Sequence, residues 1–545
     1  MIRRVSVGHW LPFAIGASAI AAGTARLGLV PTGDAPHMLS IADRLAGMLQ
    51  RGDAVGFFQY WSSLVTPHPP AGLAVAVGWM LVGVERFAAP LTALTGLALA
   101  WHGVLLLTRV RGASARSPWM AALLVFSLPA TWTYVAHMSW DVLAAGCVAA
   151  CLGHLHASDG LRQRGHTVAF GAFMGLGFVT KYTFPAFLVL PAAAAGVAVV
   201  RRKTWRGLVV SLVAFAAVSG PWLFTHGDAM WAYVVSSSGA SKTISDSPAM
   251  AWGARASWSN ALYYPTVLRD AVGWPGMIVL SAAVWRAWHR PAVRWVLGSV
   301  LGAWLVLTFA GENQSRYFFP AVPLLAVAFE RGLRSADGVT LRRWAVACGL
   351  VVTVPALAGG WLAHGADEEI PPSRDQSHAS TPLFQWGAWP RASAAFRPMS
   401  NPVDEWRVEA AVAAMAIETG DGTHQVGLLL PRDARMPPGS TYAWLAGLAG
   451  MDWSVATVVA QGPGGKPMVF VGPLKPMGDA VSRRFAVAYA VHQRGDLPDL
   501  LLSLGAQSRW QQDLPQGMQG TVFRVPASGW TSSTGLMLQK DPLDG

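Results

Sequence analysis

Residues 137–181 read HMSWDVLAAGCVAACLGHLHASDGLRQRGHTVAFGAFMGLGFVTK. Two apolar segments in this stretch, 142–157 and 167–180, are separated by a polar loop that carries two arginines. Apolar segments joined by a short basic loop are typical of neighbouring transmembrane helices whose loop is cytoplasmic. Asp141 and Lys181 are then expected at the opposite, outer ends of these two helices.

The same pattern extends over residues 1–363, where basic residues gather in every second loop. Positive loops face the cytoplasm, so the residues beyond 363 are expected on the outer side. The segment 71–84 is apolar but short for a crossing, and it is interpreted as an interfacial or re-entrant helix on the outer side. Eleven spans are predicted: 10–30, 87–108, 118–136, 142–157, 167–180, 183–200, 207–225, 271–288, 293–310, 317–331 and 344–363.

The N-terminal span follows Arg3-Arg4, as the apolar part of a signal peptide would. Its apolar run continues to Val30, about 20 residues, which is long enough to cross a bilayer. We therefore interpret it as an uncleaved anchor of an integral protein of a bacterial-type inner or plasma membrane.

Composition agrees with a membrane location. Charged residues make up 13% of the 545 residues, against about 25% in soluble domains, and 53% of the residues are hydrophobic. Residues 1–363 contain 27 basic and 12 acidic residues, whereas 364–545 contain 14 and 17. A basic excess confined to the membrane part indicates loop orientation and anionic lipid. No basic stripe lies on a soluble face, so nucleic-acid binding is not expected.

The C-terminal part changes character twice. A polar, proline-rich linker covers 364–402, and periodic segments resume over 403–545. Alternating strands and helices predict a small extracytoplasmic α/β domain. Its expected elements are a helix over 404–418, strands over Val426–Leu430 and Met468–Val471, and a helical stretch near 441–450.

Two carboxylates are predicted at the outer membrane boundary. Asp34 follows the first span in Thr32-Gly33-Asp34-Ala35-Pro36-His37, and Asp141 opens a later span. A carboxylate there could accept a proton from a hydroxyl group or hold a metal. The alternative for each carboxylate is that it caps the N-terminus of a helix. For Asp34 this would be a helix over 36–49.

A histidine lies in the same outer loop, in Thr66-Pro67-His68-Pro69-Pro70. The prolines make this a rigid turn before a helix. His68 is a candidate for phosphate binding, proton transfer or metal ligation. His37 and His137 are also predicted outside, so a divalent metal is conceivable. No tight ligand spacing supports one, and no metal ligand is assigned.

Basic residues at the outer boundary form a second group of candidates. Lys181 interrupts apolar sequence, so it either snorkels to the interface or meets an anion such as phosphate. Arg316 has a planar guanidinium that suits phosphate oxygens, and its alternative is an ion pair with Glu312. Arg255 and Arg269, in the loop 226–270, are weaker candidates of the same kind.

Together these segments resemble the GT-C class of polytopic glycosyltransferases, and above all the superfamily of protein mannosyltransferases and aminoarabinose transferases. The resemblance covers about residues 30–330. Two positions depart from the family pattern: Ala35 replaces an acidic residue and Ala71 replaces a leucine. The matching segments are Asp34, His68-Pro69-Pro70, Asp141, Gly171 to Lys181, and Arg316-Tyr317-Phe318-Phe319-Pro320.

The resemblance implies an inverting transferase that uses a polyprenyl-phosphate sugar as donor and a lipid, glycan or protein as acceptor. Asp34 would be the base on the acceptor hydroxyl, and Asp141 would position acceptor or sugar. Lys181 and Arg316, beside Tyr317, would neutralise the departing phosphate. Two alternatives remain: a transporter or flippase of lipid-linked sugars, and a GT-C scaffold that binds a glycan without catalysis.

Overall fold

The structure is a computed structural model that describes most of the helical part and a sheet. The chain divides into two compact units, Met1–Arg26 with Met48–Pro398 and Leu27–Gly47 with Met399–Gly545. The described residues are 7–27, 35–64, 70–84, 87–108, 118–136, 140–235, 261–309, 315–334, 339–340, 343–346, 408–419, 423–430, 452–459, 468–471, 487–493, 506–514 and 518–524.

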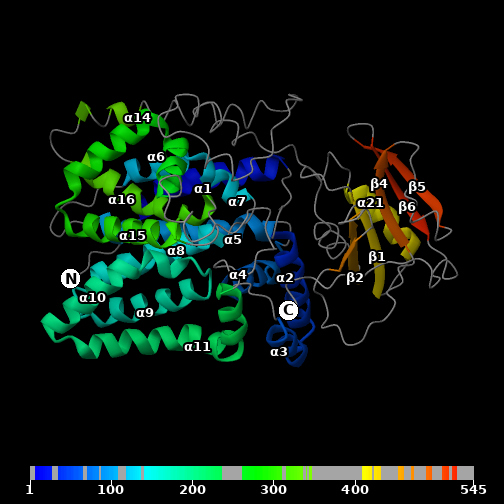
Figure 1. The fold of residues 1–545 in the computed structure, drawn as a ribbon, viewed down its shortest axis with the longest axis horizontal. Coiled ribbons are helices and arrows are strands. Elements are labelled where there is room, and N and C mark those ends of the chain that lie inside the picture. Colours follow the sequence, from blue (N-terminus) through cyan, green and yellow to red (C-terminus); the bar gives the residue numbers. More distant parts are fainter. Residues whose placement is uncertain are drawn as a thin grey trace. The chain divides into compact units, whose positions relative to one another are not determined.

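Most of the chain before residue 347 is helical (Figure 1). The described helices are η1 (Val7–His9), α1 (Leu11–Leu27), α2 (Ala35–Gln50), α3 (Ala54–Ser62), α4 (Pro70–Leu81), α5 (Ala88–Thr108), α6 (Trp119–Ser127), α7 (Pro129–Ala136), α8 (Trp140–Ala157), α9 (Arg164–Phe178), η3 (Phe184–Phe187), α10 (Val189–Arg202), α11 (Trp205–Val235), α14 (Tyr263–Ala287), α15 (Pro291–Thr308), η5 (Ser315–Phe318) and α16 (Ala321–Leu333).

The centre of the bundle is the pair α5 and α8, which pack backbone to backbone. A Cβ atom added at Gly103 would lie 2.2 Å from the carbonyl of Ala149, and one at Gly146 would lie 2.2 Å from the Gly96 carbonyl oxygen. Glycines therefore set the approach of the two helices, as small residues do in membrane helix packing. Every residue of α8 from Asp141 to Leu155 is buried.

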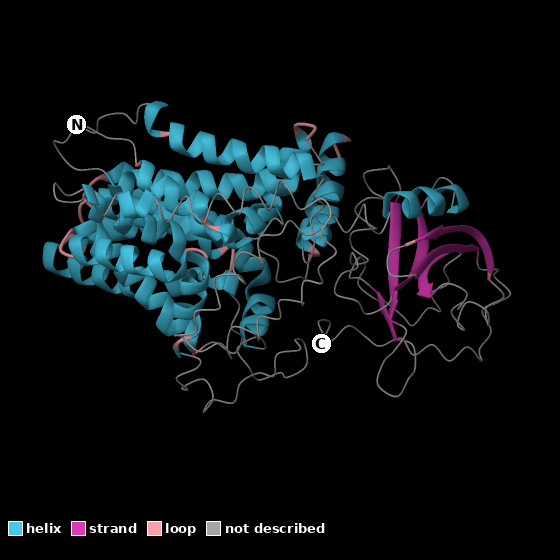
Figure 2. Cartoon of the chain, turned by 90° about the horizontal axis from the view of Figure 1, so that it is seen from above, coloured by secondary structure: helices cyan, strands magenta, loops and turns pink. Residues whose placement is uncertain are grey.

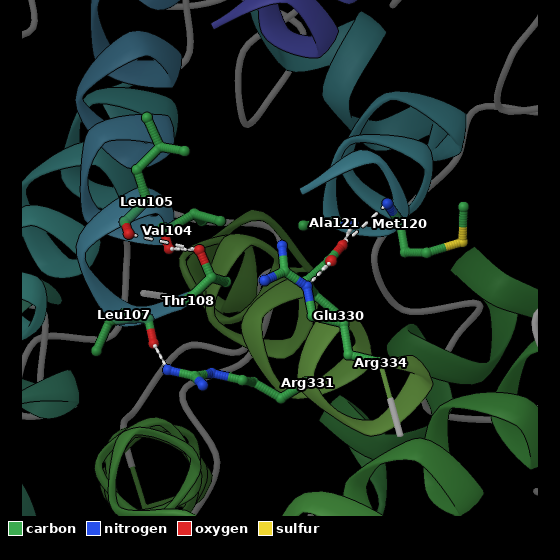
Figure 3. Close-up of polar contacts among 9 residues, drawn as sticks. All are labelled: Val104, Leu105, Leu107, Thr108, Met120, Ala121, Glu330, Arg331 and Arg334. Carbon is green, nitrogen blue, oxygen red and sulfur yellow. Dashed lines mark hydrogen bonds and ion pairs between the residues drawn. The ribbon is translucent and has the colours of Figure 1, made fainter. Parts of the chain in front are cut away.

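One end of the bundle is fastened by a carboxylate on α16 (Figure 3). Glu330 is 3% exposed, and its Oε2 accepts hydrogen bonds from the backbone N–H groups of Met120 and Ala121, 3.0 Å each, in the first turn of α6. Arg334 donates to the other carboxylate oxygen at 2.5 Å. Arg331 donates to the carbonyl of Leu107, at the C-terminal end of α5, at 2.8 Å. A buried carboxylate and a partly buried guanidinium are thus paired with the free backbone groups of two helix ends.

The helices agree with most of the predicted spans. Four described helices are long and apolar enough to cross a membrane by length and composition: Ala88–Thr108, Trp140–Ala157, Trp205–Ala232 and Pro291–Thr308. Shorter apolar helices include Leu11–Ala22, Pro70–Leu81 and Gly276–Ala287. The total of eleven spans stays a prediction, and most of the last span, 344–363, lies outside the described residues.

One predicted span, 118–136, is divided into α6 and α7. Leu128 between them is extended, with ψ 126°, and Pro129 follows it. A proline disfavours the helical conformation of the residue before it, so the helix ends there and a new one begins at the proline.

The second unit contains a six-stranded sheet, drawn in magenta in Figure 2. Its strands lie in the order β3-β2-β1-β4-β6-β5; β1 pairs in parallel with β2 and β4, and the outer pairings are antiparallel. Helix α21 (Val408–Thr419) packs on β4 and β6. The strands are β1 (Thr423–Leu430), β2 (Asp452–Val459), β3 (Met468–Val471), β4 (Val487–Gln493), β5 (Gln507–Asp513) and β6 (Met518–Arg524).

The predicted mixture of strands and helices is therefore present, and β3 has the predicted bounds. The sequence did not predict β2, β4, β5 or β6. The helical stretch expected near 441–450 and the linker 364–402 lie outside the described residues.

Candidate functional site

Two candidate residues meet at one end of the pair α8 and α9. Asp141 lies in the first turn of α8, and Lys181 follows the end of α9. A turn over residues 158–163 joins the two helices, which pack against each other. The start of α8 and the end of α9 consequently lie at the same end of the bundle, as the sequence predicted.

Asp141 and Lys181 form an ion pair. The Lys181 Nζ atom is 2.5 Å from Oδ2 of Asp141, and the side chains are 15% and 1% exposed, respectively. A carboxylate this deeply buried is costly unless a cation compensates it. The pair therefore fixes the position of the lysine ammonium while leaving part of it accessible.

The Arg-Tyr segment reaches the same ammonium from η5. The Lys181 Nζ atom lies 4.8 Å from the centre of the Tyr317 ring, within the range of a cation–π contact. Next to it, the Phe318 ring stacks on Tyr264 of α14 with 5.0 Å between ring centres. Aromatic packing thus anchors η5 against the bundle beside the ion pair.

The end of the proline turn also abuts this site. The backbone N–H of Ala71, in the first turn of α4, donates to the carbonyl of Val179 at 3.2 Å. A Cβ atom added at Gly72 would lie 1.7 Å from the Trp140 ring, so only glycine lets α4 approach the start of α8. Residues of four segments far apart in sequence meet here.

Sequence reasoning missed two polar groups beside the pair. The indole Nε1 of Trp140 and the hydroxyl of Thr183 are buried and have no hydrogen-bond partner among the described residues. Such groups are rare in folded proteins and often mark a place where a ligand or water binds. Their only sequence signal is that they adjoin Asp141 and Lys181.

The other candidates are placed less completely. Arg269 lies on α14 and is 2% exposed. The backbone of Arg316 belongs to η5, but its side chain lies outside the described residues, as do Asp34, His68 and Arg255. Helix α2 begins at Ala35, directly after Asp34, so the helix that the capping alternative for Asp34 requires is present.

Metal binding has no support from the described residues, among which no three His, Cys, Asp or Glu side chains could hold one ion. The side chains of Asp34, His37, His68 and His137 lie outside that set. The chemistry that the described site offers is electrostatic: a cation held by a buried carboxylate at one end of the bundle, with the ring of Tyr317 over it.

Comparisons with known proteins identify the fold. The chain is similar to ArnT from Cupriavidus metallidurans bound to undecaprenyl phosphate, with a TM-score of 0.59 and 13% identity over 96% of this chain and 99% of that one. For the apo state of ArnT the TM-score is 0.57, with 15% identity over 95% and 98%. No protein-family model and no curated protein sequence matches.

The predicted resemblance to the aminoarabinose transferase superfamily is therefore confirmed for the fold. The likeness to ArnT extends over almost the whole of both chains. With its apolar helices, this fold makes the chain an integral membrane protein.

Proposed function

We propose that this chain, which has the fold of ArnT, transfers a sugar from a polyprenyl-phosphate donor to an acceptor hydroxyl at the outer face of the membrane. The observation that carries the proposal is the Asp141–Lys181 pair with the ring of Tyr317 over the lysine, at the end of the bundle that the sequence predicts to face outward. A fixed, partly exposed cation suits a phosphate that gains charge as it leaves. The ArnT structure bound to undecaprenyl phosphate supports a ligand of this class.

In the proposed reaction the acceptor oxygen attacks the anomeric carbon from the face opposite to the phosphate. The bond between that carbon and the phosphate oxygen breaks, and the configuration inverts. The acceptor proton passes to the carboxylate of Asp34, which acts as general base. The polyprenyl phosphate leaves with the bonding electrons, and Lys181 and Arg316 stabilise its charge.

The ion pair suggests a more definite role for Asp141 than positioning acceptor or sugar. Because its Oδ2 atom binds Lys181, we assign Asp141 as the positioning residue of that lysine. His68 would support the phosphate site from the turn before α4. Arg269 and Arg255 would add positive potential, and a divalent metal with three or more His, Cys, Asp or Glu ligands would need at least one of them outside the described residues.

Binding of undecaprenyl phosphate tests the phosphate role. Lys181→Met and Arg316→Met should each weaken binding about tenfold or more, because a charge-assisted hydrogen bond contributes roughly 1.5–3 kcal/mol. Arg294→Met, which removes an exposed arginine on α15, is the matched control and should bind normally. Unchanged affinity in both well-folded site variants would exclude this role.

Turnover separates an enzyme from the alternatives. Mass spectrometry of lipids that copurify with the protein would supply the donor, and release of polyprenyl phosphate would measure transfer. Asp34→Asn can still cap α2 but takes no proton, so turnover should fall by about 10²–10⁴-fold while donor binding persists. Parental turnover would place the base elsewhere. If the unaltered protein moves the lipid between leaflets without consuming it, the protein is a flippase. If it only binds glycan, it is a scaffold.

A further inference from the structure

A second charged feature lies at the other end of α8 and α9. Six basic side chains project from two turns and form what we call the basic patch: Arg162, Arg164, Arg201, Arg202, Lys203 and Arg206. Helix α8 is 18 residues long, or about 27 Å, close to the thickness of a bilayer core. The patch is thus at the opposite membrane boundary from the Asp141–Lys181 pair.

The two turns pack together, which concentrates the charge. A Cβ atom added at Gly207, in the first turn of α11, would lie 2.2 Å from the carbonyl oxygen of Leu161. One added at Gly160 would lie 2.8 Å from the Nη1 atom of Arg202. Lys203 ends α10 in a left-handed conformation, φ 54°, so α11 begins two residues later. The fold therefore holds these cations side by side.

Internal pairing leaves most of this charge uncompensated. Arg202 contacts Asp159 at 3.4 Å, and both side chains are about half exposed. The other five basic side chains of the patch form no ion pair with another described residue. Counted together with Asp159, the six basic side chains of the patch carry a net charge of +5. Such a surface attracts anions.

The surroundings of the patch identify the kind of anion. Trp205, Val200 and Val209 are more than half exposed, and Trp205 begins a helix apolar enough to cross a membrane. Exposed valines at this boundary face acyl chains, and tryptophan favours the level of lipid headgroups. An acidic protein or nucleic acid would match the charge but would leave the apolar surface uncovered.

We infer that the basic patch binds the phosphate headgroup of an anionic phospholipid, whose acyl chains lie along the exposed valines of α10 and α11. Guanidinium groups suit phosphate oxygens, and basic pockets between membrane helices recognise such headgroups. The predicted orientation places this lipid in the cytoplasmic leaflet. The inference does not depend on the transferase activity.

Native mass spectrometry of the full chain in detergent tests the inference, with dioleoyl phosphatidylglycerol as the anionic probe and dioleoyl phosphatidylcholine as the neutral one. The unaltered chain should retain phosphatidylglycerol preferentially. Each basic residue contributes about fivefold to binding, so Arg201→Gln, Lys203→Gln and Arg206→Gln together should weaken it by about 100-fold. Arg202 is left unchanged because it contacts Asp159.

The turn between α14 and α15 provides a matched control. Arg286→Gln, Arg290→Gln and Arg294→Gln remove the same charge at another predicted cytoplasmic turn and should weaken lipid retention clearly less than the patch variant does, because the bound lipid is proposed at the patch alone. If both triple variants lose phosphatidylglycerol equally, the binding reflects general electrostatic attraction and the inference is overturned. Equal retention of the two lipid probes by the unaltered chain would also overturn it. If the triple variant of the patch fails to fold, the single variants Arg164→Gln and Arg206→Gln are measured instead. About fivefold weaker binding of phosphatidylglycerol supports the inference, and unchanged binding refutes it.

Discussion

At the scale of single residues, the Lys181 ammonium is held between a buried carboxylate and an aromatic ring. Asp141 reaches the ammonium from α8. Tyr317 reaches it from η5, which lies 136 residues further along the chain than Lys181. A snorkelling lysine would need neither partner. The two contacts instead fix one position of the cation at this end of the bundle, which favours a role in binding.

Removing the lysine should destabilise the fold. Lys181→Met leaves the Asp141 carboxylate buried without its cation, which should cost roughly 3–5 kcal/mol in an SDS unfolding titration. The double variant Lys181→Met with Asp141→Asn should regain most of that loss. The matched control is Arg202→Gln, which breaks a half-exposed pair and should cost less than about 1 kcal/mol. Equal costs for Lys181→Met and Arg202→Gln would contradict the buried pair.

A second residue gives the sheet unit a pH dependence. Burial raises the pKa of Tyr489 from 10 to about 12, and the hydrogen bond from Gln512, at 3.4 Å, opposes this shift only in part. The tyrosine of the unfolded chain ionises first, so stability is full below pH 10 and falls as the pH rises to 12.

The free energy of unfolding should fall by about 2–3 kcal/mol across this pH range, because the pKa of Tyr489 differs by about two units between the folded and the unfolded chain. Denaturant unfolding of the full chain, followed by the circular dichroism of the sheet at pH 9 to 12, measures it. Tyr489→Phe should remove the part of the decrease in unfolding free energy with pH that comes from this tyrosine. An unchanged slope in that variant would assign the alkaline sensitivity to another group.

At the scale of elements, contact between α5 and α8 depends on glycine. Gly103→Ala would place a methyl group 2.2 Å from the Ala149 carbonyl, which the packed backbones can relieve only by separating. Overpacking of this kind should cost about 1–3 kcal/mol in SDS unfolding. Gly298→Ala on α15 meets no atom within 4 Å and should be neutral or slightly stabilising, because alanine favours helix. Equal effects of the two substitutions would refute the close packing.

Elements differ in how well their sequence predicts them. The apolar runs predicted α5, α8 and α15 within two residues, because a bilayer demands long apolar helices. Strands β5 and β6 were missed. The sequence of β5, QSRWQQD, has no apolar run, and its place in the sheet comes from pairing with β6. Strand propensity depends more on such neighbours than helix propensity does.

At the scale of the whole molecule, the orientation in the membrane is the remaining prediction. Single cysteines introduced near Asp34, Ser238 and Gly422 should react with an impermeant reagent from outside the cell. A cysteine near Arg164 should react only after permeabilisation, because basic loops stay in the cytoplasm. Cys147 and Cys151 are fully buried and should give little background, and Cys348→Ser removes the third thiol. Labelling of the Arg164 position from outside would invert the proposed placement of the site.

The sequence by itself determined the membrane class, most helix positions and the placement of Asp141 and Lys181 at the same end of two neighbouring helices, because hydropathy and loop charge act locally along the chain. Only the tertiary structure decided that these two residues form a buried pair, that Tyr317 lies over the lysine, and that Trp140 and Thr183 adjoin them without a described partner. Only it joined two basic turns into one patch. Contacts between distant segments depend on glycine packing and aromatic anchoring, which no local pattern encodes.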